Sequence, residues 1–165
     1  MSRTGFYWHE RCFWHDQGAI GVFSAPGEFL QPQAASESPE SKRRLKNILE
    51  VSGLIDELQV VKPPAAQLTD LLRFHTLRYL DELQAGDKTR GGNGGDCAPY
   101  MPGSWAAATQ SAGLAIAAVE AVAKGEVSNA YALCRPPGHH AEADQGRGFC
   151  LLGNIPVAVM RARAL

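Results

Sequence analysis

Two patterns of apolar positions follow one another along the chain. In some segments apolar residues recur at helical spacing, and in others they form short runs typical of buried strands. A segment at 25–39 is rich in proline and small polar residues and is expected to be a long loop. After it, apolar residues recur three and four positions apart, which predicts a helix. Ser38 is placed to cap this helix and Gly53 to end it. Its apolar face comprises Leu45, Ile48 and Leu49.

Further elements follow in an order that indicates the fold class. The sequence predicts a short strand at 58–62, one bent or two short helices at 68–86, a glycine-rich loop at 87–103, a buried helix at 104–124 capped by Ser104, a buried strand at 130–134, and a helix that starts at Asn154. Strands that alternate with helices predict an α/β domain with a parallel sheet. Aromatic residues crowd positions 6–14, and no element is assigned to them.

Composition narrows the class of protein. The 165 residues are 45% hydrophobic and carry a net charge of −1, which favours one globular domain and argues against nucleic acid as a partner. We expect no apolar run long enough to span a bilayer. The first residues lack the features of a signal peptide, so a cytoplasmic location is expected. The four cysteines are dispersed, without a C-x-x-C pair, and are expected to be thiols.

One stretch carries a pattern of chemical interest, residues 135–150, RPPGHHAEADQGRGFC. The strand at 130–134 would deliver this stretch to the carboxyl edge of the sheet, where ligands bind in α/β folds. Two prolines and Gly138 leave its first part few conformations. His139 and His140 could therefore act as a pre-organised base and a charged neighbour. Two alternatives are a solvated polar loop and a structural zinc site made by Cys134, His139, His140 and Cys150.

The longer run RPPGHHAEADQGRGFCLLGNIPVAV resembles the active-site signature of the zinc-dependent histone deacetylases. It is most similar to the class II and bacterial types, the histone-deacetylase-like and acetylpolyamine amidohydrolases. SKRRLKNILEVSGL, LLRFHTLRYLDEL and GGNGGDCAPYMPGSW resemble earlier parts of the same family. The resemblance implies the N-terminal part of an arginase/deacetylase-type three-layer α/β fold with a parallel sheet. Residues 1–165 would then be the N-terminal portion of a single deacetylase domain.

The resemblance also implies a reaction, the hydrolysis of an acetyl amide on a lysine or a polyamine. His140 would be the general base and His139 its electrostatic partner. Gly148 would offer its backbone carbonyl to the substrate, and Phe149 would form a wall of the tunnel around the lysine stem. Cys150 would line the pocket where acetate leaves.

Other residues match the family pattern less specifically. Asp96 would accept hydrogen bonds from substrate amides at the rim, or it is a solvated loop residue. Arg43 would lie near an internal channel for acetate, or on a solvated helix face. A group of aromatic and histidine residues near the N-terminus either forms an entrance rim or packs in the ordinary way: Trp8, His9, Trp14 and His15. We assign His75 to packing rather than catalysis.

The resemblance supplies no metal ligands within these residues. The family's Zn²⁺ is held by two aspartates and a histidine in segments that follow the histidine loop, so the cofactor Zn²⁺ is expected to have its ligands outside this chain. The chain alone is therefore expected to be inactive. The alternative is a non-catalytic fragment that binds a partner or assembles as a homo-oligomer through its exposed strand edge.

Overall fold

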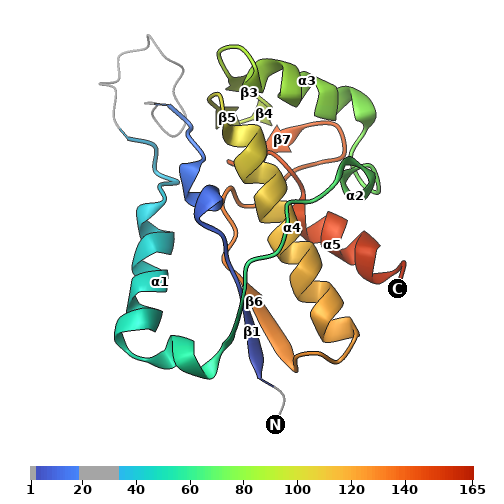
Figure 1. The fold of residues 1–165 in the computed structure, drawn as a ribbon. Helices are drawn as coiled ribbons and strands as arrows, with labels where there is room; N and C mark the ends of the chain where they lie inside the picture. The colour runs from blue at the N-terminus through green and yellow to red at the C-terminus, as the bar shows by residue number, and fades with distance from the viewer. Residues whose placement is uncertain (1–2, 19–33) are drawn as a thin grey trace.

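The computed structural model describes residues 3–18 and 34–165, and its framework is a parallel three-stranded sheet (Figure 1). The strands stand in the order β2 (Gln59–Val61), β1 (Thr4–Tyr7) and β6 (Asn129–Ala132). Both neighbours run parallel to β1, with Phe6 opposite Val60 on one side and Tyr131 on the other. This topology confirms the α/β class.

The central strand, β1, is the element that the sequence analysis missed. A strand buried on one face alternates apolar and polar residues, whereas a strand buried on both faces does not. Phe6 and Tyr7 point to opposite faces, and both are buried. The pattern at this position therefore carries no alternation that would distinguish a strand from a cluster of aromatic residues.

The predicted helices are present, and the pattern at 68–86 resolves into two of them. The helices are η1 (Glu10–Trp14), α1 (Glu40–Val51), η2 (Leu54–Glu57), α2 (Leu68–Leu71), α3 (Leu77–Asp87), α4 (Ser104–Ala123) and α5 (Asn154–Ala162). The glycine-rich loop contains three two-residue strands, β3 (Gly92–Asn93), β4 (Gly95–Asp96) and β5 (Pro99–Tyr100). Residues 19–33, which include most of the predicted long loop, lie outside the described residues.

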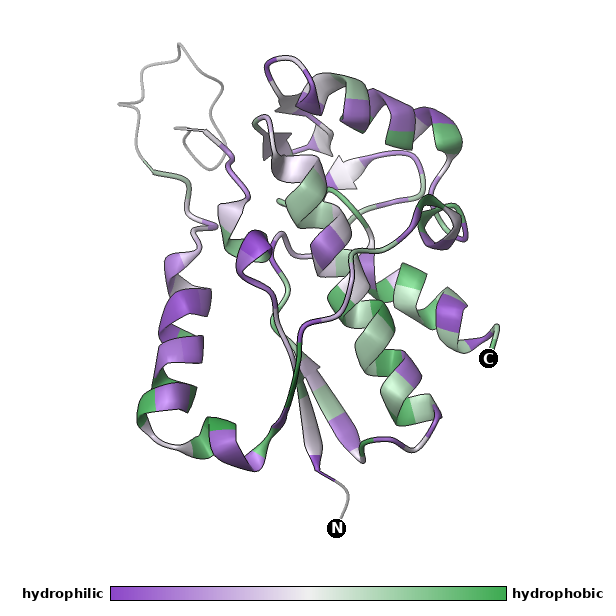
Figure 2. Ribbon diagram, in the orientation of Figure 1, coloured by the Kyte–Doolittle hydropathy of each residue, from purple (hydrophilic) through white to green (hydrophobic). Residues whose placement is uncertain are grey.

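Helix α4 connects two hydrophobic clusters and separates α1 and the sheet from α5 (Figure 1). One cluster joins α4 to β1 and η1, and the other joins it to α2, α3 and α5. Figure 2 shows the result: α4 is pale or green along most of its length, whereas α1, on the other side of the sheet, is largely purple. Helices on both sides of the sheet give the three layers.

The expectation that no apolar run is long enough for a bilayer was wrong about length. The 20 residues of α4 satisfy the length and composition of a membrane-spanning helix, but 61% of that window is buried inside this fold. Packing against two clusters accounts for an apolar surface on nearly all sides of the helix.

Three expected helix caps were misassigned. Pro39, rather than Ser38, occupies the N-cap position of α1, and no side chain caps that helix. For the other two the reason is tertiary. Gly103 and Gly153 occupy the N-cap positions of α4 and α5, and Ser104 and Asn154 lie inside the first turns. Both side chains are buried and bond to other segments of the chain instead of their own helices. At Gly53, by contrast, a φ of +76° ends α1 as predicted.

Candidate active site

The histidine loop, residues 135–140, leaves the end of β6 and is fixed by its own backbone carbonyls. The Pro136 carbonyl accepts a 2.8 Å hydrogen bond from the Ser111 hydroxyl and a 3.3 Å bond from Asn154 Nδ2. The Gly138 carbonyl accepts from the backbone N–H of Ile155 at 3.1 Å. A Cβ at Gly138 would collide with Asn154, so only glycine allows the loop to lie this close to α5. The loop is therefore anchored to both α4 and α5.

The two predicted catalytic histidines lie side by side at the end of this loop. The imidazole rings of His139 and His140 have centroids 4.2 Å apart and an angle of 56° between their planes. Both residues are exposed. His140 packs against Gly148, where an added Cβ would come within 2.9 Å of His140 Cδ2. A φ of +50° at Gly148 adds a second reason for glycine here.

Three residues predicted to bind substrate, Asp96, Gly148 and Phe149, are brought together by a short parallel pairing of β4 with β7 (Gly146–Arg147). The Gly148 N–H donates to the Asp96 carbonyl at 2.9 Å, and the Phe149 N–H donates to the Cys97 carbonyl at 2.7 Å. Phe149 has a φ of +68°, an uncommon value for a bulky residue. These two backbone bonds thus fix Gly148, which packs against His140, and the adjacent Phe149. The Asp96 carboxylate lies 3.4 Å from the Arg147 Nε.

Cys150 lies buried next to the histidine loop. Burial raises the pKa of its thiol, and the backbone N–H groups of His140, His139 and Ala141 oppose that shift. Its sulfur therefore faces the backbone that carries the two imidazoles. All four cysteines of the chain are free thiols, as predicted.

A cavity of about 570 Å³ lies beside the histidine loop, between α1, β6 and α5. His139 and Lys42 both line it. The guanidinium of Arg43 lies 2.9 Å from Glu10 Oε1 and 4.9 Å from the Phe13 ring centroid, and Arg43 is not among the residues that line the cavity. Lys42, rather than its neighbour Arg43, therefore lines the same cavity as His139.

The aromatic and histidine group near the N-terminus divides into packing and exposed residues. Trp8 and His15 are buried, which favours the packing interpretation for both. Trp14 is 74% exposed.

His75, assigned to packing, is buried as expected and also makes two specific hydrogen bonds. Its Nε2 accepts from the Gly153 N–H at 2.9 Å, so its Nδ1 carries the proton and donates to the Ala143 carbonyl at 3.2 Å. Burial lowers its pKa. The Tyr79 hydroxyl donates to the Leu151 carbonyl at 2.7 Å. The two side chains hold the segment that returns from the histidine loop to α5.

Sequence reasoning missed these supporting contacts and a further one, the buried Arg135. A polar residue inside an apolar helix was the available signal at Ser111, whereas Asn154 begins its helix and gave no such signal. Among the described residues, no group of three or more histidine, cysteine, aspartate or glutamate side chains could hold a metal ion. The alternative of a structural zinc site in the histidine loop is therefore wrong.

Comparison with known proteins assigns the chain to a family. Residues 36–165 match the model of the histone deacetylase domain, and the chain belongs to the histone deacetylase family. It is 49% identical over 165 residues to a histone deacetylase-like amidohydrolase of Pseudomonas aeruginosa, an alignment that covers 98% of this chain and 43% of that protein. It is 50% identical over 70 residues to an acetylpolyamine amidohydrolase of Burkholderia pseudomallei, covering 42% of this chain and 20% of that protein.

A solved structure gives the same assignment. The HDA15 HD domain superposes with a TM-score of 0.85 at 27% sequence identity, covering 99% of this chain and 44% of that one. The expected arginase/deacetylase-type fold is thus confirmed. The chain spans less than half the length of the first relatives that it matches.

Proposed function

We propose that this chain contributes the general base and part of the substrate tunnel to an amidohydrolase that removes acetyl groups from lysine or polyamine amines. The observation that carries the proposal is the imidazole pair, with ring centroids 4.2 Å apart, on a loop whose carbonyls are bonded to two helices. A base held in one position lowers the entropic cost of reaching the transition state. The similarity to amidohydrolases supports the choice of an acetyl amide as substrate.

Each residue then has a chemical task. His140 accepts the proton of the attacking water and returns it to the departing amine. His139, whose ring lies beside that of His140, is its electrostatic partner. Phe149 provides an apolar wall for the methylene stem of the substrate, and the Gly148 carbonyl accepts a hydrogen bond from the scissile amide N–H. Asp96 accepts hydrogen bonds from substrate amides at the rim.

Zn²⁺ is the cofactor that this proposal includes, and the described residues do not by themselves fit it. They contain no cluster of three or more candidate ligands. We therefore propose that the ligands belong to sequence outside these 165 residues, in the part of the relatives that the chain does not span. Bound there, Zn²⁺ would supply Lewis-acid chemistry. The 165 residues alone are then expected to show no turnover, and zinc-dependent hydrolysis by them would contradict this.

The test compares His140→Ala with Asp144→Asn, a change at an exposed carboxylate on the same segment. Both are made in the protein together with the sequence that completes its catalytic domain. An acetyl-lysine peptide and an N-acetylated diamine serve as substrates. We expect His140→Ala to lower kcat by about 10²–10⁴-fold, the usual contribution of a general base, and Asp144→Asn to leave it unchanged. Full activity in the alanine variant would refute the role of His140.

A second function, assembly with another chain, is favoured by the edge of β6. This strand pairs with β1 on one side, and Tyr131 is 52% exposed. An open strand edge presents backbone groups that another strand can pair with. Light scattering of the 165-residue chain tests assembly with a second copy of itself, since a discrete oligomer supports self-assembly and a monomer contradicts it.

A further inference from the structure

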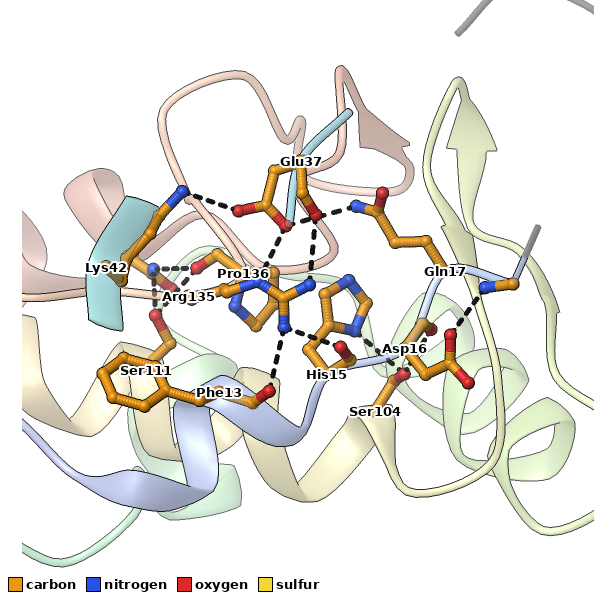
Figure 3. Close-up of polar contacts among 12 residues, drawn as sticks. Phe13, His15, Asp16, Gln17, Glu37, Lys42, Ser104, Ser111, Arg135 and Pro136 are labelled. Carbon is orange, nitrogen blue, oxygen red and sulfur yellow. Dashed lines mark hydrogen bonds and ion pairs between the residues drawn. The ribbon is translucent and has the colours of Figure 1, made fainter. Parts of the chain in front are cut away.

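Arg135 is the first residue of the histidine loop, and its side chain makes contacts that the proposed reaction does not use. The residue is 2% exposed. One terminal nitrogen of its guanidinium, NH1, donates to the His15 carbonyl at 2.6 Å and lies 3.4 Å from the Phe13 carbonyl. The other, NH2, donates to the Glu37 carbonyl at 3.1 Å (Figure 3). One side chain therefore holds two segments that lie about a hundred residues away in sequence.

The backbone next to this side chain is held by contacts separate from those of the guanidinium. The next residue, Pro136, is bonded through its carbonyl to Ser111 and Asn154, which lie on α4 and α5. The guanidinium thus projects from an anchored point of the fold. The segments that it holds are attached to that point.

Glu37 extends the contact toward the cavity beside the histidines. Its Oε2 lies 3.1 Å from Arg135 Nε and 3.5 Å from Gln17 Nε2, and its Oε1 accepts from Lys42 Nζ at 2.8 Å (Figure 3). Lys42 lines the same cavity as His139. A continuous set of bonds therefore runs from Arg135 through Glu37 to the cavity wall formed by Lys42.

We propose that Arg135 is a positioning residue, which holds residues 13–17, Glu37 and Lys42 against the histidine loop and so sets one wall of the cavity that His139 lines. The consequence for substrate binding rests on the proposed function, whereas the positioning itself does not. Arginine suits this task because a rigid planar fork can donate to several carbonyls at once. A lysine would keep the positive charge, but its single ammonium group could not donate to all of these carbonyls at once.

His15 provides a reporter of this contact that needs no activity. The Ser104 hydroxyl donates to the Asp16 carbonyl, so it accepts from His15 Nδ1 at 2.9 Å. Burial, and then the charge of Arg135, lower the pKa of His15 to about 3. If residues 13–17 detach from the loop, His15 meets water and its pKa rises.

The experiment follows the imidazole signals of His15 by NMR between pH 4 and pH 8 in Arg135→Lys and Arg135→Met. Arg78→Gln is the control, an arginine in an exposed ion pair with Glu82. We expect His15 to stay unprotonated above pH 5 in the parent chain and the control, and to titrate with a pKa of about 6 in both Arg135 variants. The lysine variant keeps the positive charge, so a raised pKa there reports solvent entry. It also decides the outcome if the methionine variant does not fold.

In the protein completed with the rest of its catalytic domain, KM for an acetyl-lysine peptide should rise roughly fivefold while kcat changes less than about twofold. The reason is that the histidine pair keeps its own anchors on α4 and α5. A folded Arg135→Lys variant in which His15 still fails to titrate overturns the proposal. A fall in kcat at constant KM also overturns it, since Arg135 would then act on the histidine pair. Absence of turnover in every form, including the parent, refutes the proposed function and leaves the His15 result decisive for Arg135.

Discussion

Acidification should destabilise this chain through one buried imidazole, that of His15. Because its Nδ1 donates to Ser104, a second proton must go to Nε2, which is buried and has no hydrogen-bond partner among the described residues. That position also lies near the Arg135 charge. The folded state therefore holds His15 neutral, while the unfolded chain binds a proton near the ordinary pKa.

The magnitude follows from the two pKa values, about 3 in the folded chain and 6.5 in the unfolded one. A depressed histidine pKa means that the unfolded state takes up more protons in acid, so stability is full above the unfolded pKa and is lost as the pH falls from about 7 toward 3. Between pH 7.5 and pH 5.0 the free energy of unfolding should fall by about 2 kcal/mol from His15 alone. His75, whose pKa is also lowered by burial, adds to the loss in the same direction.

The assay is urea denaturation followed by tryptophan fluorescence at both pH values, in the parent chain and in His15→Gln. Glutamine can still donate to Ser104 but has no site to protonate. We expect the pH-dependent loss of stability to shrink by about 2 kcal/mol in this variant. His9→Gln, at a partly exposed histidine, should keep most of the parent's pH dependence. An equal loss in the parent and in His15→Gln would refute the assignment to His15.

Three further changes test other parts of the structure. Tyr79→Phe removes a buried bond to the Leu151 carbonyl and should lower the free energy of unfolding by about 1–2 kcal/mol in urea denaturation, whereas the half-exposed Tyr131→Phe should change it by less than about 0.5 kcal/mol. Gly138→Ala forces a Cβ against Asn154 and should lower the free energy of unfolding by about 1–3 kcal/mol in the same assay, a prediction that fails if this free energy does not change. Asp96→Asn should leave the free energy of unfolding unchanged, because the ion pair of Asp96 with Arg147 is exposed. In the completed enzyme it should raise KM for a peptide substrate more than KM for an acetylated diamine. Equal effects on both substrates would contradict a role for Asp96 in binding peptide amides.

The helices and outer strands could be predicted because their signals are local. Leu45 and Leu49 repeat on one face of α1, and Gly53 adopts the left-handed conformation that ends that helix. Helix α4 was predicted as buried because it is apolar on nearly all sides, and two hydrophobic clusters do cover it. The histidine loop was found from its prolines and glycine, which restrict the backbone before any partner is known.

The features that were missed depend on residues distant in sequence. Ser104 is of a residue type common at helix N-caps, yet its hydroxyl donates a hydrogen bond to the carbonyl of Asp16 in another segment. Arg135 looked like the first residue of a motif, and its partners lie about 100 and 120 positions earlier. A local sequence pattern does not predict which carbonyls a buried guanidinium binds, because the fold brings these distant segments together.

The placement of β1 between β2 and β6 has a consequence for how the chain is made. Tyr7 leaves the ribosome long before Ala132, its neighbour in the sheet. At about 5–20 residues per second, roughly 6–25 s of translation separate the two. Through that interval Phe6 and Tyr7 are without β6, and for most of it they are also without the residues of α4 that share their hydrophobic cluster. We therefore expect the nascent chain to be retained by chaperones that bind aromatic segments until β6 has been synthesised.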